Sequence, residues 1–228
     1  MLVLKLALLV FLPGYLLFRI PFADRQRRAA LPIEERAFWA IILSILTASL
    51  VGLGLAAAEQ YTLRRLLVGQ AVIAIFITGV WRGRLRYGNP PARPGFSLVA
   101  ILLVLAAGAF VFFPPSEYII GGKDPGVYVN EGIQIAQRGA LLITDRVVAG
   151  LPPEYRDLFF PSHGNPSYYS IRFMGFFIQD PGLGAVMGQF PHVYPLWIAI
   201  GYGLCDIKGA LSVAGTASLL ALLAFSLT

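Results

Sequence analysis

Apolar residues gather along the chain into six blocks, and polar stretches separate each block from the next. A helix needs roughly 17–25 mostly apolar residues to cross a bilayer. No block alternates apolar and polar residues as a half-buried strand does, and lipid admits only helices or closed barrels. The pattern predicts an all-α polytopic membrane protein with about six transmembrane helices, over residues 2–20, 37–58, 66–81, 97–113, 191–207 and 210–228.

The polar stretches between the blocks predict how the chain is oriented. The connections 19–36 and 82–96 carry five and four arginines, whereas the connection 59–65 carries two. Arginine-rich connections stay in the cytoplasm. We therefore expect the N-terminus and the long loop 114–190 on the outer side, in a bacterial inner (plasma) membrane.

Composition agrees with a membrane protein. Hydrophobic residues make up 57% of the 228 residues and charged residues 13%, about half the charged share of a soluble domain. The net charge of +6 raises the question of nucleic acid. Because most arginines lie in the short connections, topology explains the charge, and we expect a lipid bilayer and no nucleic acid as partner.

The two ends of the chain add two expectations. No small-residue cleavage site follows the first block, so we expect a retained helix and not a signal peptide. The last block stops at Thr228 without a polar tail, which suggests a truncated sequence.

The loop 114–190 is the long hydrophilic segment of the chain, and its many aromatic residues predict a small folded element on the membrane surface. Asp124 suits a helix N-cap, Pro125 suits the first helical position, and Gly139 suits the C-terminal cap. These signals predict a short helix over 125–138.

This helix is amphipathic. Its apolar face comprises Val129, Ile133 and Ala136, and its polar face comprises Tyr128, Glu131 and Arg138, with Asp124 just ahead. An amphipathic helix that follows a membrane crossing lies in the interface plane. We therefore expect its polar side to face a cavity or the water.

Asp124 has two interpretations. It is either a helix cap alone, which contributes about 1 kcal/mol, or a carboxylate that takes a proton from an acceptor or holds a cation. The residues themselves leave both open.

A wider arrangement surrounds this acid. Tyr128 follows four residues after Asp124, and the helix ends in Ala136-x-x-Gly139. After the loop, the next apolar helix begins with Phe190-Pro191-His192-Val193-Tyr194-Pro195. The arrangement resembles the N-terminal part of the lipid-carrier-dependent glycosyltransferases of the GT-C fold, in the branch of the protein O-mannosyltransferases and the lipid A aminoarabinose transferases.

The resemblance covers about residues 97–228, and it divides the chain into an N-terminal three-helix segment, 1–96, and a GT-C-like start. It implies transfer of a sugar from a polyprenyl-phosphate donor to an acceptor on the outer face; the sugar and the acceptor are not specified. The essential loop acid of that family corresponds to Asp124, which activates the acceptor, sometimes with a divalent metal ion. Two departures stand out: Pro125 occupies the place of a second acid, and four helices precede the loop where the family usually has one.

The remaining candidates have weaker patterns. For substrate binding they are Lys123, Tyr128, Glu131 and His192; Lys123 also fits a solvated lysine or a lipid-headgroup contact, and His192 a satisfied interfacial histidine. His163, in a turn-rich stretch, is a candidate metal ligand with Asp124 or a solvated loop histidine. No close-spaced ligand pair supports zinc.

Two other functions compete with glycosyl transfer. A non-catalytic scaffold or accessory subunit would dock partners through the outer loop, and six helices suit it better than a complete transferase. A transporter fragment would carry acids or broken helices inside the membrane, and the blocks contain no acid apart from Asp206 at a helix end.

Overall fold

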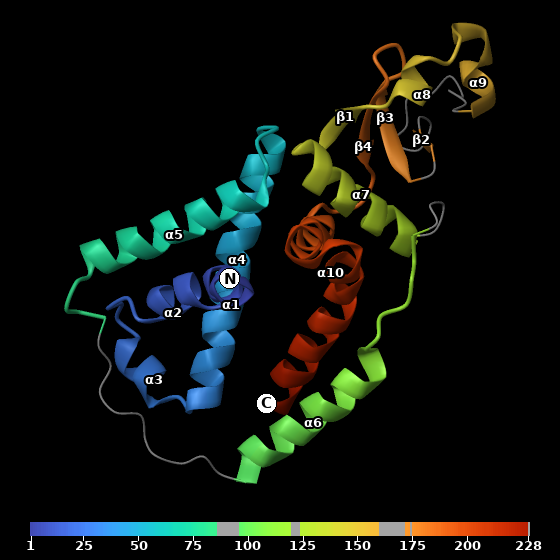
Figure 1. Ribbon diagram of the computed structural model, residues 1–228. Coiled ribbons are helices and arrows are strands. Elements are labelled where there is room, and N and C mark those ends of the chain that lie inside the picture. Colours follow the sequence, from blue (N-terminus) through green and yellow to red (C-terminus); the bar gives the residue numbers. More distant parts are fainter. Residues whose placement is uncertain (86–95, 120–123, 160–171, 174, 228) are drawn as a thin grey trace. The chain divides into compact units, whose positions relative to one another are not determined.

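The computed structural model describes residues 1–85, 96–119, 124–159, 172–173 and 175–227 (Figure 1). Helices make up most of the described chain, as predicted. A four-stranded sheet interrupts them, so the all-α prediction is wrong for one part of the long loop.

Three helices are long and apolar enough to cross a membrane. They are α4 (Ile33–Ala57), α5 (Leu63–Val80) and α10 (Val193–Ser226). Apolar helices that are shorter than a full span lie at Leu2–Phe18 and Leu98–Phe112, the latter within α6 (Phe96–Phe112). One of these three helices, α10, covers two of the predicted spans, 191–207 and 210–228. The number of six spans stays a prediction.

The first apolar block is a broken helix and not the continuous one predicted. Phe11, with φ −140° and ψ −56°, separates α1 (Leu2–Val10) from α2 (Leu12–Phe18). Pro13 lies at the start of α2, where its missing N–H costs no intrahelical bond. A six-residue helix, α3 (Arg25–Ala30), then lies in the arginine-rich connection.

Helix α10 also breaks, at Cys205 and Asp206. Asp206 has φ 55° and ψ −149°, outside any helical conformation. The short stretch Asp206-Ile207-Lys208-Gly209 between the last two apolar blocks predicts a tight turn, but the helical backbone resumes directly after Asp206. The turn is therefore shorter than predicted, and Lys208 and Gly209 belong to the helix.

The chain forms two compact units. One comprises Met1–Val51, Arg64–Pro115 and Ser212–Thr228; the other comprises Gly52–Leu63 and Ser116–Leu211. The predicted division at 96/97 rests on the family resemblance and stays a prediction.

The second unit contains an antiparallel sheet with strand order β1-β4-β3-β2. The strands are β1 (Leu142–Thr144), β2 (Arg172–Phe173), β3 (Phe176–Asp180) and β4 (Ala185–Gly188). A tight turn joins β3 to β4, in which Asp180 Oδ1 accepts hydrogen bonds from the N–H groups of Gly182 and Leu183.

Short helices and aliphatic side chains complete this folded element. The short helices are α8 (Arg146–Ala149), the 3₁₀ turn η1 (Pro153–Tyr155) and α9 (Arg156–Phe159). The core consists of Val148, Ile178 and Val186, with Ile143 and Leu151 packed against it. The aromatic residues over 155–177 predict an aromatic core for the loop, but two of them, Tyr155 and Phe159, are about half exposed, at 51% and 52%.

The α4–α5 connection belongs to the same unit as the loop. The Tyr61 N–H donates to the Gly139 carbonyl at 3.0 Å, and the Leu141 N–H donates to the Ala56 carbonyl at 3.2 Å. Tyr61 is buried, with 2% of its surface exposed. Residues 56–61 and 139–141 therefore pack as one piece of structure.

Candidate functional site

The predicted loop helix is α7 (Asp124–Arg138), and its bounds agree with the prediction to within one residue. Gly139 ends it with φ +77°, a conformation that favours glycine, and its N–H donates to the Ile135 carbonyl at 2.9 Å. Asp124 in the first turn and Arg138 in the last complement the helix dipole. Local signals therefore fix where α7 begins and ends.

Close packing against α10 holds α7 in position. A Cβ built on Gly132 would lie 2.5 Å from Ile198 Cβ and 2.7 Å from the Pro195 carbonyl oxygen. Only glycine allows this approach, because real Cβ atoms do not come so close to backbone. No local pattern indicates this contact, because a glycine inside a helix is ordinarily unfavourable.

The face of α7 that we predicted to be open is in part buried. Glu131 has no exposed surface, whereas Ile133, on the predicted apolar face, is half-buried. Of the two expected surroundings of the polar side, a cavity or the water, burial excludes the water for Glu131. A buried carboxylate is costly unless it is paired, so its partners determine what it does.

His192 is the partner of Glu131. His192 Nδ1 lies 2.5 Å from Glu131 Oε1, and the histidine side chain keeps 24% of its surface exposed. The second carboxylate oxygen, Oε2, is buried and has no hydrogen-bond partner in the part of the chain described. Gly188 of β4 lies against this oxygen. The structure thus brings together two residues that were predicted separately.

The pair favours a charged histidine. The hydrogen bond to Glu131 raises the pKa of His192 above its ordinary value, and the carboxylate charge adds to this, while burial opposes it. The imidazolium donates its Nδ1–H to the carboxylate in a charge-assisted hydrogen bond. A partly exposed positive charge, supported by a buried negative one, suits an anionic group of a ligand.

Aromatic rings flank this pair. The Tyr128 ring lies 4.8 Å from the Phe190 ring and 5.2 Å from the Tyr194 ring, measured between centroids. Tyr128 is one turn before Glu131 on α7, and the other two rings flank His192 in sequence. The site is therefore a charged pair with an apolar aromatic wall.

Asp124 stands at the head of the same helical face. Seven residues separate it from Glu131, which is about 10 Å along the axis and nearly the same angular position. It is exposed and makes no hydrogen bond or ion pair with another described residue. Its contacts therefore do not distinguish a helix cap from a functional carboxylate. Lys123 and His163, the other predicted candidates, lie outside the described residues.

The described residues do not form a metal centre. They contain no group of three or more histidine, cysteine, aspartate or glutamate side chains placed to hold one ion. The other candidate ligand, His163, lies outside the described residues, so a divalent ion at Asp124 stays a prediction and no step below uses a metal.

Comparisons of the chain with protein-family models, with curated proteins and with solved structures find no match. The site must therefore be interpreted from its own chemistry and from the motif residues quoted above.

Proposed function

We propose that this chain is a membrane glycosyltransferase that moves a sugar from a polyprenyl-phosphate donor to an acceptor on the outer face. The observation that carries the proposal is the arrangement along one face of α7. An exposed carboxylate, Asp124, heads a face that continues through Tyr128 to Glu131, which is buried against His192. Asp124, Tyr128 and His192 are motif positions on which the family resemblance rests, whereas Glu131 is outside those motifs.

In the proposed reaction, Asp124 is the general base. The acceptor hydroxyl oxygen forms a bond to the anomeric carbon of the donor sugar, and the bond from that carbon to the phosphate oxygen breaks. The electron pair leaves with the polyprenyl phosphate, and the Asp124 carboxylate takes the hydroxyl proton. An exposed carboxylate outside the apolar helices suits this role, because an acceptor reaches it from water.

The Glu131–His192 pair would bind the donor phosphate. The raised pKa of His192 favours its cationic form, and charge-assisted hydrogen bonds to phosphate are stronger than neutral ones. Glu131 acts through His192 by holding its charge and its ring orientation. The rings of Tyr128 and Tyr194 offer an apolar surface to the first units of the lipid carrier.

The proposed membrane topology has six spans, with the N-terminus and the loop outside. The arginine-rich connections support it. The hydrogen bonds between residues 56–61 and 139–141 add support, because two segments that bond to each other lie on one side of a membrane.

Asp124→Asn tests the proposed base. It keeps the size of the side chain but removes its basicity, so transfer from a radiolabelled polyprenyl-phosphate sugar in membranes should fall to background at unchanged protein level. Glu117→Gln, which alters another exposed loop acid, is the matched control and should retain activity. Full activity of Asp124→Asn would refute the role.

A further inference from the structure

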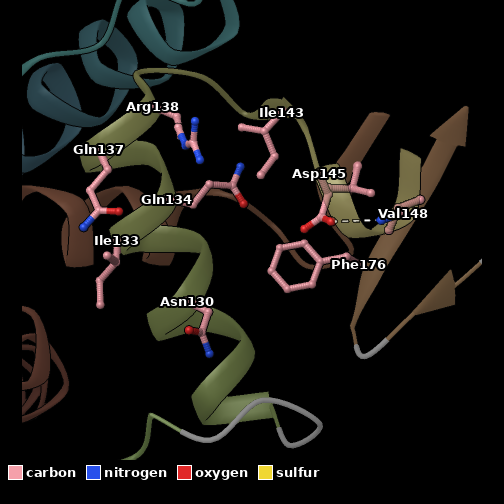
Figure 2. Close-up of a pocket in the computed structure, with 10 residues that line it drawn as sticks. Asn130, Ile133, Gln134, Gln137, Arg138, Ile143, Asp145, Val148 and Phe176 are labelled. Carbon is pink, nitrogen blue, oxygen red and sulfur yellow. Dashed lines mark hydrogen bonds between the residues drawn. The ribbon is translucent and has the colours of Figure 1, made fainter. Parts of the chain in front are cut away.

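A pocket of about 390 Å³ opens beside α7, and neither Glu131 nor His192 is among its lining residues. Side chains of α7, of β1, β3 and β4, and of the segment around α8 line it, and all belong to one compact unit. Figure 2 shows Gln134 and Arg138 on one side, and Asp145 and the Phe176 ring on the other. The volume is at the lower end of the range for small-molecule sites, which suits a ligand of one or two rings.

Three oxygen acceptors are left open to this pocket. The amide nitrogens of Asn130 and Gln134 already donate to backbone carbonyls: Asn130 to Ile119 and Gly126, Gln134 to Leu141. Their amide oxygens accept no hydrogen bond within the described residues. Asp145 Oδ1 caps α8 by accepting from two backbone N–H groups, so its Oδ2 is also free.

One cation and one ring complete the lining. The Arg138 guanidinium is exposed and makes no hydrogen bond or ion pair with another residue of the described chain. It brings several N–H donors in a fixed plane. Phe176 is half-buried and presents an apolar ring next to Asp145.

These features select one ligand chemistry. An anion would meet the Asp145 carboxylate and the amide oxygens, and an apolar ligand would leave three acceptors without water. A metal cation would be repelled by the Arg138 guanidinium, which lines the same pocket. Adjacent hydroxyl groups on a sugar-like ring satisfy the oxygen acceptors, the guanidinium and the aromatic ring together. Each hydroxyl donates to an oxygen acceptor and accepts from the Arg138 guanidinium, and the C–H face of the ring packs on Phe176.

We propose that this pocket binds a neutral sugar ring. The site shares no lining residue with the proposed transfer site, so it holds or fails independently of the proposed function. The ring would belong either to a free oligosaccharide or to a glycolipid headgroup.

Saturation-transfer NMR on the full chain tests the proposal. The protein is held in a detergent without a sugar headgroup, because maltosides would compete. One arm uses free maltose and lactose, and the other uses octyl glucoside below its micelle concentration. We expect saturation of the ring protons in at least one arm; preference for the alkyl glycoside would indicate a lipid-linked source.

Two variants assign the binding to this pocket. Arg138→Ala removes the donors, and Asp145→Asn keeps the cap of α8 while turning the free acceptor into a donor. Each should weaken binding about tenfold, with an unchanged unfolding temperature. Arg146→Ala, an exposed arginine outside the lining, should bind as the parent does. No signal in either arm, or binding that both variants leave unchanged, would overturn the proposal.

Discussion

Gly188 lies so close to Glu131 that a Cβ built at residue 188 would be 2.1 Å from Glu131 Oε2. The strand β4 thus leaves a space the size of a carboxylate, and a glycine is what keeps it open. His192 holds the other oxygen, at 2.5 Å. The carboxylate is therefore confined on both sides, by backbone at one oxygen and by a titratable ring at the other.

Gly188→Ala should displace this carboxylate. We expect a loss of about 1–3 kcal/mol in the free energy of unfolding, because overpacking of a close contact forces side chains and backbone to shift. Thermal unfolding in detergent measures it. Gly54→Ala is the control, because a Cβ there meets nothing within 4 Å, and alanine favours the helix by up to about 1 kcal/mol. Equal effects of the two substitutions would contradict the close packing at Gly188.

Substitution of His192 and substitution of Glu131 should lower the free energy of unfolding by different amounts. His192→Ala leaves the buried Glu131 without a partner, which costs about 3–5 kcal/mol. Glu131→Gln removes the buried charge itself and leaves a partly exposed histidine, which costs about 1 kcal/mol. Chemical denaturation of the two variants should therefore rank His192→Ala as the less stable, and the reverse order would show that the pair is not buried as described.

The pair should also make stability depend on pH. The pKa of His192 is raised in the folded protein, mainly by its hydrogen bond to Glu131, so folding favours the protonated form. The stabilisation is complete below the unfolded pKa of about 6.5 and is lost as the pH rises through the folded pKa. The difference in unfolding temperature between the parent and Glu131→Gln should shrink over that window. A difference independent of pH would mean that His192 stays neutral.

Local patterns in the sequence predicted the long helices and α7 well. Apolar length gave α4 and α5 to within a few residues, and the signals at Asp124 and Gly139 gave both ends of α7. The strands were missed because β2 has two residues and β1 has three. Elements this short form only when partners distant in sequence pair with them, and they leave no periodic pattern.

The break at Phe11 was predictable, whereas the site was predictable only in part. Pro13 interrupts the first block and is an ordinary signal for the start of a new helix. Glu131 and His192 were both candidates, but 61 positions separate them, and no local pattern relates them. Their pairing depends on Gly132 and Gly188, whose importance appears only when the neighbouring atoms are known.

The hydroxyl of Tyr61 is buried, and removing it tests how the surrounding residues pack. Its oxygen has no hydrogen-bond partner among the described residues, and burial raises the pKa of the phenol. Tyr61→Phe removes a hydroxyl that has no hydrogen-bond partner among the described residues. The free energy of unfolding should therefore stay equal or rise by up to about 1–3 kcal/mol, and the unfolding temperature should follow it. A clear loss would reveal a water or lipid group that bonds to the hydroxyl. Tyr128→Phe makes the same substitution at a side chain that is only half-buried, and its unfolding temperature is compared with that of Tyr61→Phe.

Cysteine labelling tests the proposed orientation. Cys205 is exposed, so the background carries Cys205→Ser. Arg27 and Arg146 are both exposed, and the proposed topology places them on opposite sides of the membrane. Arg146→Cys in the loop should therefore react with a membrane-impermeant maleimide in intact cells, and Arg27→Cys in the arginine-rich connection only after permeabilisation. Labelling of Arg27→Cys in intact cells would show that the topology is the reverse of the one proposed.

The hydrogen bonds that join the α4–α5 connection to the end of α7 have a practical consequence. A short polar turn between two apolar helices is where an epitope tag or a fluorescent protein is ordinarily inserted. Here the Tyr61 amide and the Ala56 carbonyl already bond to Gly139 and Leu141. An insertion between residues 57 and 62 would separate these partners and disturb the folded loop, so a reporter belongs elsewhere in the chain.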